Sequence, residues 1–348
     1  MGAKIRLMIV DDSAVIRKII QRTAEEDPDI EVVAQVANGK EAVEKARELK
    51  PDLITMDVEM PVMNGLEALK AIMSASPTRV LMVSSLTTEG ADTTLEALSQ
   101  GAVDFLAKPS GGSPLAVQKI KESLLEKIRA VAASRIVPAG SVLPPAVPQT
   151  PPPAPGPVIR PTGKVELILI GTSTGGPNAL QMVIPRLPGD LPVGVLIVQH
   201  MPPAFTTQLA SRLDKMSALR VKEAEEGDPI CPGQVLLAPG HSHLVVRRRG
   251  QVGLEEEPAD LPHRPAVDVM VTSAAAIYGA GALGVIMTGM GQDGKQGLAD
   301  LKEKGGIIIA QDEKTSVVYG MPRAAVEAGL ADQVCPLEKV ASAILRQL

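Results

Sequence analysis

The 348-residue chain is longer than one typical domain and suits two, each able to bury its own core. Its 35 Lys and Arg against 40 Asp and Glu give a net charge of -5, which argues against a general affinity for nucleic acid or for an anionic membrane. Two cysteines without CxxC spacing exclude a disulfide framework, and no apolar run approaches the ~18 residues of a membrane helix, so we expect a cytoplasmic protein that does not insert into a membrane.

The first 133 residues alternate between apolar runs typical of strands and segments with helical periodicity. Strands are expected at 5–10, 30–36, 52–56, 79–83 and 102–106. Helices are expected at 13–26, 39–49, 64–74, 90–100 and 115–130. Five short strands with helical crossovers predict an α/β domain with a doubly wound parallel sheet over residues 1–133.

A proline-rich segment follows this domain. Residues 134–163 hold ten of the chain's thirty prolines and only two charges, Arg135 and Arg160. Such a sequence can form neither a helix nor a central strand, and polyproline II is its natural state. It predicts a semi-extended linker between two domains, although a rigid structural arm is an alternative.

The strand and helix patterns resume at residue 164 and run to residue 348. Strands are expected at 165–170, 194–199, 234–238, 243–247, 282–288 and 306–310. Helices are expected near 177–184, 204–216, 266–279, 293–304, 322–328 and 336–347. The pattern predicts a second, mainly parallel α/β domain with an antiparallel hairpin within 234–256.

Polar residues stand where strands of the first domain end. Asp11 and Asp12 follow the first strand, Asp57 the third, Ser84 the fourth and Lys108 the fifth. The carboxyl ends of parallel strands line one crevice, and three carboxylates there would repel one another unless a hard cation such as Mg²⁺ lay among them. A hydroxyl and an ammonium facing that cluster suit a phosphoryl group. Each aspartate taken alone could equally be a helix N-cap.

The joint pattern "VDDS", "MDVEMPVMNG", "SS" and "AKP" resembles the receiver domain of two-component response regulators over residues 4–130. The resemblance implies a flavodoxin-like fold in which a histidine kinase phosphorylates Asp57. It implies that Asp11, Asp12, Asp57 and the Glu59 carbonyl hold Mg²⁺, and that Ser84 and Lys108 contact the phosphoryl oxygens. Phe105 occupies the position of the family's aromatic switch.

The stretch "IGTSTGGP" at 170–177 opens the second domain and has three interpretations. A dinucleotide-binding turn needs a glycine where Ser173 stands, and a Walker phosphate loop needs a lysine that is missing. A nucleophile elbow needs a strand, a tight turn with small neighbours and a helix, which this stretch offers. The G-x-S-x-G match alone is a weak signal for a catalytic serine.

A catalytic serine also needs a base and an acid that orients it. Of the four histidines, only His200 ends the parallel strand that follows the serine's own strand, in "VLIVQH". His241 and His243 flank a turn, and His263 lies in the loop "LPHRP". Asp293 follows another strand end, in "MTGMGQDG". Three strand ends of one sheet can converge, which predicts a Ser173, His200 and Asp293 triad.

The blocks "GTSTGGP", "VQHMP", "MTGMGQDG" and "TSVVYGMPRAA" resemble the catalytic domain of the chemotaxis protein-glutamate methylesterases, the CheB family, over about 164–348. The resemblance implies a Rossmann-like methylesterase domain without a cofactor. It implies hydrolysis of glutamate γ-methyl esters on chemoreceptors, with methanol released, and deamidation of receptor glutamines. Backbone N–H groups near Thr174 and Met290 would face the oxyanion.

A switch domain tethered to an enzyme suggests regulation, so we expect the unphosphorylated receiver to obstruct access to Ser173 and phosphorylation to relieve this. Three other outputs stay open. The chain could be a phospho-dependent adaptor with a vestigial esterase fold, or it could hydrolyse a different ester or amide. Transcriptional control is a poorer match, because the only dense basic run, Arg247–Arg249, suits a solvated hairpin tip and no helix-turn-helix pattern is present.

Overall fold

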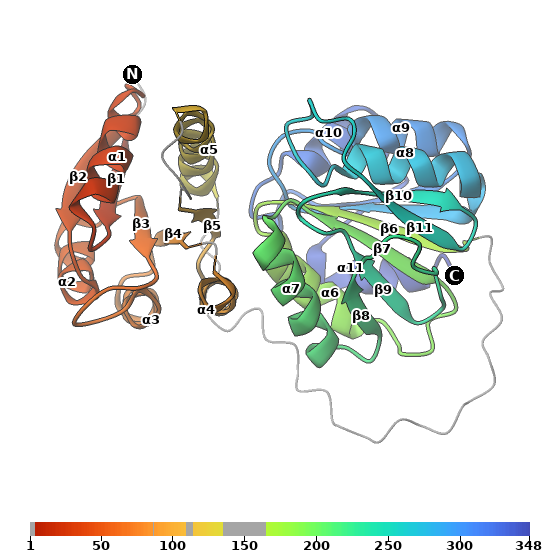
Figure 1. Cartoon of the computed structure of the whole chain (residues 1–348), viewed down its shortest axis with the longest axis horizontal. Coiled ribbons are helices and arrows are strands. Elements are labelled where there is room, and N and C mark those ends of the chain that lie inside the picture. The colour runs from red at the N-terminus through yellow and green to blue at the C-terminus, as the bar shows by residue number, and fades with distance from the viewer. Residues whose placement is uncertain (1–3, 86, 109–113, 135–164) are drawn as a thin grey trace. The chain divides into compact units, whose positions relative to one another are not determined.

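The computed structural model describes residues 4–85, 87–108, 114–134 and 165–348. The chain divides into two compact units, Met1–Val142 and Leu143–Leu348 (Figure 1). The predicted proline-rich linker 134–163 lies, apart from Ser134, outside the described residues.

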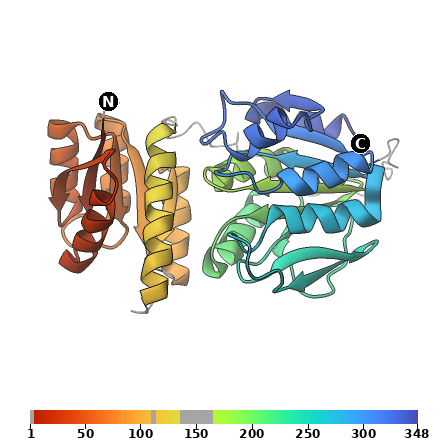
Figure 2. The same cartoon turned by 90° about the horizontal axis from the view of Figure 1, so that it is seen from above.

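The N-terminal domain is a five-stranded parallel sheet in the order β2-β1-β3-β4-β5, with helices on both faces (Figure 2). Its strands are β1 (Ile5–Val10), β2 (Ile30–Val36), β3 (Leu53–Asp57), β4 (Arg79–Ser84) and β5 (Asp104–Ala107). Its helices are α1 (Ala14–Glu25), α2 (Gly39–Leu49), α3 (Gly65–Ala75), α4 (Thr88–Ser99) and α5 (Pro114–Ala133). Helices α1 and α5 contact each other, as do α2, α3 and α4 in turn. The predicted flavodoxin-like fold is confirmed.

The C-terminal domain is a seven-stranded sheet, parallel throughout, in the order β14-β13-β12-β6-β7-β9-β8. Its strands are β6 (Leu167–Thr172), β7 (Gly194–Gln199), β8 (Arg220–Glu223), β9 (Gln234–Leu237), β12 (Ala282–Ile286), β13 (Ile307–Gln311) and β14 (Gln333–Cys335). Its α-helices are α6 (Gly176–Val183), α7 (Pro203–Met216), α8 (Val267–Tyr278), α9 (Lys295–Glu303), α10 (Met321–Glu327) and α11 (Leu337–Leu345). Helices α8, α9 and α10 cover one face and α6, α7 and α11 the other (Figure 1).

The predicted hairpin is present within the window 234–256, but it occupies only residues 243–255. Strand β9 joins the parallel sheet beside β7, so only β10 (His243–Arg248) and β11 (Gln251–Glu255) pair in the antiparallel sense. This hairpin packs against α8. Strands β8, β11 and β14 were not predicted. β8 reads "RVKE", β11 reads "QVGLE" and β14 has three residues, which leaves no apolar run to detect.

In each sheet the chain reverses its direction of winding at one point. The reversal falls between β1 and β3 in the N-terminal domain and between β6 and β12 in the C-terminal domain. Loops at the carboxyl ends of two such strands diverge to opposite faces and leave a crevice, where ligands of open α/β sheets bind. The predicted carboxylates stand at the ends of β1 and β3 in one domain, with Ser84 and Lys108 at the ends of β4 and β5, and the predicted triad follows β6, β7 and β12 in the other.

Aliphatic side chains build the core of both domains. Every residue of β6, β7 and β12 is buried, which explains why these strands read as continuous apolar runs. Among the described residues, the buried hydrophobic side chains are Leu, Ile, Val, Ala and Met apart from Phe105, Phe205, Tyr278 and Cys335. Each buried Leu or Ile contributes roughly 1.5–3 kcal/mol from the removal of its apolar surface from water. The central strands therefore hold the site-bearing loops on a rigid base.

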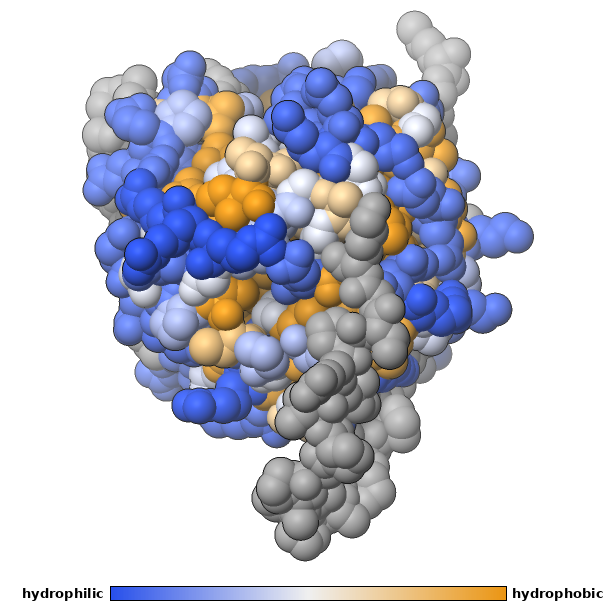
Figure 3. Space-filling model, turned by 90° about the vertical axis from the view of Figure 1, so that its right-hand side faces the viewer, coloured by the Kyte–Doolittle hydropathy of each residue, from blue (hydrophilic) through white to orange (hydrophobic). Residues whose placement is uncertain are grey.

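Among the described residues, no helix is both long and apolar enough to cross a membrane. The face shown in Figure 3 mixes hydrophilic with apolar residues over its coloured part. The three arginines of the predicted hairpin tip are paired: Arg247 with Glu255, Arg248 with Gln251 and Arg249 with Glu166.

Gly65, the first residue of α3, approaches the backbone of Asp57 too closely for any other residue type. A Cβ atom at this position would lie 1.9 Å from the Asp57 carbonyl oxygen. The Gly65 N–H donates to the Val58 carbonyl at 2.9 Å, and Asn64 with Glu67 closes a capping box at the helix start. The sequence "MNG" thus fixes α3 against the end of β3.

Gly65→Ala is expected to destabilise the N-terminal domain alone, by more than about 2 kcal/mol. The added methyl group would force the start of α3 away from the Asp57 backbone. Calorimetry should show two transitions, and tyrosine fluorescence identifies the one of the C-terminal domain, since Tyr278 and Tyr319 both lie there. The matched control is Gly250→Ala, at φ +81 with nothing within 4 Å of an added Cβ, which should cost about 1 kcal/mol. A Gly65→Ala loss no larger than that of the control would contradict the close approach.

Candidate functional site

Ser173 and His200 are neighbours because of the strand register. The ladder between β6 and β7 ends at the pair Thr172 and Gln199, so the next residue of each strand stands beside the other. The His200 N–H donates to the Thr172 carbonyl at 3.1 Å and extends the pairing by one step. The sheet itself therefore brings these two side chains to the same edge.

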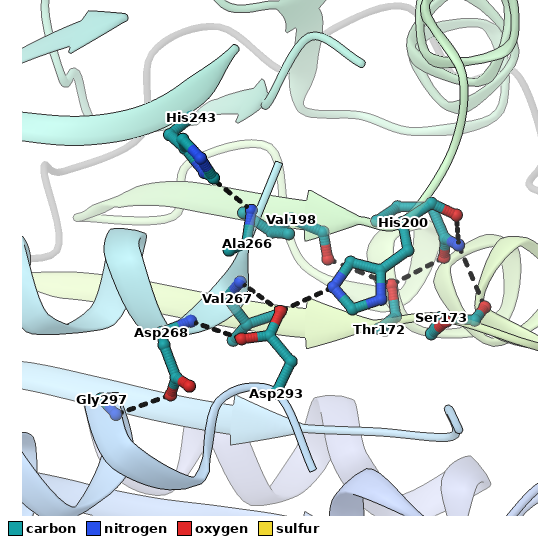
Figure 4. Close-up of polar contacts among 11 residues, drawn as sticks. Thr172, Ser173, Val198, His200, His243, Ala266, Val267, Asp268, Asp293 and Gly297 are labelled. Atoms are coloured by element: carbon teal, nitrogen blue, oxygen red, sulfur yellow. Dashed lines mark hydrogen bonds and ion pairs between the residues drawn. The ribbon is translucent and has the colours of Figure 1, made fainter. Parts of the chain in front are cut away.

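His200 is bound to Asp293. Its Nε2 atom lies 2.7 Å from Asp293 Oδ2, and only 7% of the His200 side chain is exposed. An ionised carboxylate accepts, so Nε2 carries the proton and Nδ1 keeps its lone pair. Nδ1 is buried and has no hydrogen-bond partner in the described part of the chain. In Figure 4 the ring lies between Asp293 and the Thr172–Ser173 segment.

Asp293 is held by the start of helix α8. Oδ2 accepts from the Val267 N–H at 2.7 Å and Oδ1 from the Asp268 N–H at 3.0 Å. Burial alone would raise the pKa of Asp293, but the His200 hydrogen bond and charge, together with the two amides, outweigh it and lower the pKa to about 2. The carboxylate is thus a permanent anion beside the imidazole.

Asp268 is a second carboxylate behind Asp293. Burial, and the charge of Asp293, raise the pKa of Asp268 to about 6, although hydrogen bonds from backbone amides oppose the rise. The strongest of these is the Gly297 N–H of helix α9, which donates to Asp268 Oδ1 at 2.7 Å. Asp268 therefore ties the start of α8 to the start of α9.

Gln199 fixes the backbone on both sides of the Ser173–His200 pair. Its Nε2 donates to the Ser173 carbonyl at 3.0 Å and to the His200 carbonyl at 3.1 Å. Its Oε1 accepts from the Thr172 hydroxyl at 2.8 Å, and the side chain is buried. A Cβ on Gly176 would lie 1.9 Å from this oxygen, so the glycine at the start of α6 leaves room for the amide.

The loop after β12 closes the site from the other side. The Ser173 N–H donates to the Thr288 carbonyl at 3.0 Å, and the Thr288 hydroxyl donates to the Thr174 carbonyl at 2.9 Å. A Cβ on Gly289 would lie 2.8 Å from Ser173 Cβ, so this glycine admits a close approach. Met290 follows directly and is half-buried.

Helix α6 begins immediately behind Ser173. Gly175 precedes it with φ +77, a left-handed conformation that favours glycine, and no side chain in the described part of the chain caps the helix. The first amides of a helix carry partial positive charge and attract an anion. Thr174, predicted to face an oxyanion through its N–H, is buried at this turn.

The other three histidines occupy different environments. His241 is exposed, and His243 is buried between two backbone partners. His263 stacks on His200, with ring centroids 4.1 Å apart and planes inclined by 21°.

In the N-terminal domain, Asp11, Asp12 and Asp57 converge as predicted from their strand ends. One oxygen from each lies within 4.8 Å of the others. Lys108 Nζ lies 2.7 Å from Asp57 Oδ2 and 3.1 Å from Asp11 Oδ2. Three carboxylate oxygens at this spacing fit a small divalent cation, and one ammonium does not neutralise three carboxylates.

Burial raises the pKa of Asp57 to about 6, with the Asp11 charge adding to the rise and Lys108 opposing it. An open pocket of about 180 Å³ lies beside the carboxylate. It is lined by Asp12, Asp57, Val58, Glu59, Ser85 and Lys108.

Ser84 does not line this pocket. Its hydroxyl is buried and donates to the Gly90 carbonyl of α4 at 3.2 Å. Phe105 is also buried, with Lys127 Nζ 5.8 Å from its ring centroid. Glu59, whose carbonyl was predicted as a metal ligand, is exposed and follows β3 at the pocket edge.

Gln199, Thr288 and Asp268 were not singled out from the sequence. A signal was present for two of them, because Gln199 ends "VLIVQ" and Thr288 ends "VIMT", each as a polar residue closing a buried apolar run. Asp268 gives no such signal, since its role depends on the approach of α9.

These two sites define a class of protein. A parallel-sheet domain with a carboxylate cluster and a lysine precedes a parallel-sheet domain in which a serine, a histidine and an aspartate stand at neighbouring strand ends beside a topological switch point. The fold and the sites are those of a hydrolase joined to a receiver.

Comparison with known proteins gives the same division. Residues 168–344 match the family model of the CheB methylesterase, and residues 7–119 match that of the response regulator receiver domain. The chain belongs to the CheB methylesterase family, so the resemblance noted in its sequence blocks is confirmed.

Relatives resemble the chain over nearly its whole length. A protein-glutamate methylesterase/protein-glutamine glutaminase of Symbiobacterium thermophilum is 48% identical over 98% of this chain and 96% of its own. One of Thermotoga maritima is 47% identical over 97% of this chain and 96% of its own. The crystal structure of the Thermotoga maritima CheB methylesterase catalytic domain covers 53% of this chain and 99% of its own, with 44% identity and a TM-score of 0.51.

Asp57→Asn is expected to stabilise the N-terminal domain at pH 7. The pKa of Asp57 is about 6 in the folded state and lies above the ordinary 3.8. Between these two pH values the folded domain holds a proton that the unfolded chain has released, so the free energy of unfolding falls as the pH rises through this range. The gain should be about 3 kcal/mol at pH 7 and should vanish below pH 4.

Calorimetry of the N-terminal transition at both pH values measures this gain. Asp92→Asn, at an exposed position on α4, is the matched control and should change little. An equal gain at pH 4 and pH 7 for Asp57→Asn would show that the charge of Asp57 is not its source.

Proposed function

We propose that the chain hydrolyses glutamate γ-methyl esters on methyl-accepting chemoreceptors, releasing methanol, that it deamidates certain receptor glutamines, and that phosphorylation of Asp57 raises this activity. The observation that carries the proposal is the His200–Asp293 hydrogen bond of 2.7 Å beside Ser173, in a domain of the methylesterase family. The names of the full-length relatives support both activities.

The first step is attack of Ser173 Oγ on the ester carbonyl. His200 Nδ1, whose lone pair is available because Nε2 is bonded to Asp293, takes the hydroxyl proton. The C–Oγ bond forms, and the carbonyl oxygen becomes an oxyanion. The Asp293 anion stabilises the imidazolium cation and keeps the ring in the required tautomer.

Backbone N–H groups near Thr174 and at Met290 stabilise the oxyanion. The Thr288 hydrogen bonds and the Gly289 close approach hold these two segments on either side of Ser173. Each such donor contributes roughly 2.7–4 kcal/mol to a transition state of this type.

Collapse of the intermediate breaks the bond to the methoxy oxygen, and His200 returns its proton so that methanol leaves. The glutamyl group is then an ester of Ser173. Water attacks this ester, His200 takes a proton from the water and gives it to Ser173 Oγ, and a free carboxylate results. For a glutamine the leaving group is ammonia, and the remaining steps are the same.

Asp57 accepts the phosphoryl group from a phosphohistidine of a chemotaxis histidine kinase. Lys108, within 2.7 Å of the Asp57 carboxylate, is placed to pair with a phosphoryl oxygen. Ser84 reaches the same group once its hydroxyl leaves the Gly90 carbonyl. Asp11, Asp12, Asp57 and the Glu59 carbonyl would hold Mg²⁺, which supplies charge neutralisation for the phosphoryl oxygens. We place these reactions in the cytoplasm, and no cofactor is assigned to the esterase site.

Ser173→Ala should lower methanol release from a methylated receptor by about 10⁴-fold or more, because the nucleophile is lost. Methanol is measured from receptor-containing membranes incubated with the full-length protein. Ser342→Ala, an exposed serine on α11, is the control and should retain full activity. Substantial methanol release by Ser173→Ala would refute the assignment of the nucleophile.

Acetyl phosphate with Mg²⁺ should raise the methanol-release rate of the wild-type protein at least several-fold, and chelation of the metal should remove the effect. Asp57→Asn should keep the basal rate and lose the response. Asp52→Asn, a matched change at the other end of the same strand region, should respond like the wild type. A response that survives in Asp57→Asn would place the phosphoacceptor elsewhere.

A further inference from the structure

The segment 256–266, which we name the strap, connects β11 to α8 and is anchored at both ends by one side chain. His243 Nε2 lies 3.2 Å from the Pro258 carbonyl, and His243 Nδ1 lies 3.1 Å from the Ala266 amide nitrogen (Figure 4 shows the second contact). The carbonyl accepts and the amide donates, so Nε2–H is a donor and Nδ1 an acceptor, which defines a neutral imidazole. His243 is fully buried. A buried, fully hydrogen-bonded ring thus fixes both ends of the strap.

Between these two anchors the strap presents His263 to the His200 ring. The two rings stack with centroids 4.1 Å apart and an interplanar angle of 21°. Offset or near-parallel stacking at this separation is an attractive arrangement of two aromatic rings. His200 is therefore contacted at one edge by Asp293 and on one face by His263.

The Asp293 hydrogen bond restrains only the Nε2 edge of the His200 ring. Rotation of the ring about the His200 Cβ–Cγ bond would swing Nδ1 away from Ser173 and would bend the hydrogen bond to Asp293 without necessarily breaking it. A ring packed on the face blocks this rotation on one side. The C-terminal end of the strap leads through Ala266 into Val267 and Asp268, whose backbone amides donate to Asp293. The strap thus reaches both members of the His200–Asp293 pair.

We infer that His263 is a positioning residue for the general base: stacked on His200, it keeps Nδ1 directed at Ser173, and His243 holds the strap that carries it. The inference rests on the proposed role of His200 in the hydrolysis of esters. It assigns no proton transfer to His263, so an aromatic ring without nitrogen atoms can replace it.

The test uses the full-length protein with the substitutions His263→Ala and His263→Phe. The first readout is the rate at which a fluorophosphonate modifies Ser173, with fluoride displaced as the Oγ–P bond forms, which requires no receptor. The second is the split between kcat and KM for methanol release. His263→Ala should lose about 5- to 10-fold in the modification rate and in kcat, with KM changed less than about twofold. His263→Phe should recover most of that loss.

His241→Ala is the matched control, because His241 is an exposed histidine two residues from His243 and should react like the wild type. His243→Gln keeps one donor and one acceptor and should preserve Ser173 reactivity better than His243→Leu, which keeps neither. Tyrosine fluorescence during thermal unfolding reports whether each variant is folded. Because His263 is only half-buried, its two variants decide the inference even if His243→Leu does not fold.

Full reactivity of His263→Ala would overturn the inference, and so would a His263→Phe variant as slow as His263→Ala, since that would give the nitrogen atoms the essential role. The proposed function fails separately. If the wild type releases no methanol while the fluorophosphonate rates follow the expected order, the substrate is wrong and the positioning role stands.

Discussion

Asp293 is the acceptor on which the geometry of the C-terminal site depends. Three donors converge on one carboxylate: the His200 ring at the end of β7 and the amides of Val267 and Asp268 at the start of α8. The carboxylate itself stands beyond the end of β12, on the far side of β6 from β7. One anion therefore joins the two halves of the sheet on either side of the switch point, and β6, the strand that leads to Ser173, lies between β12 and β7.

The two domains use the same residue type in opposite electrostatic settings. Asp57 is buried beside Asp11, and its pKa is raised to about 6. Asp293 is buried among hydrogen-bond donors, and its pKa is lowered to about 2. These settings suit the proposed roles. A carboxylate that forms a bond to phosphorus benefits from an environment that does not over-stabilise its charge, whereas a carboxylate that balances an imidazolium benefits from permanent ionisation. Gly65 and Gly289 provide the close backbone approaches that make each setting compact.

The apolar runs and their order were sufficient to predict the class of both domains and most of their strands, because buried parallel strands have a continuous signal. Strands β8 and β14 escaped prediction because edge strands of three or four residues need little apolar sequence. Strand β11, which reads "QVGLE", was also missed because it has no continuous apolar run. Within the site, strand ends and motif resemblance led to Ser173, His200 and Asp293. Gln199 carried a signal as a polar residue that ends an apolar strand, but its hydrogen-bond partners and the stacking of His263 could not be predicted, because they depend on groups that meet only in the folded domain.

The orientation of His200 has a mechanical consequence. With Nε2 committed to Asp293, the atom left for Ser173 is Nδ1, which is bonded directly to Cγ and so lies nearer the main chain than Nε2 does. An angular error at χ1 displaces an atom in proportion to its distance from the rotation axis, so the short lever to Nδ1 converts a given error into a smaller shift. In the proposed mechanism, the accuracy of proton transfer is then set largely by the backbone of β7, a strand buried at every position, and less by the reach of a long side chain.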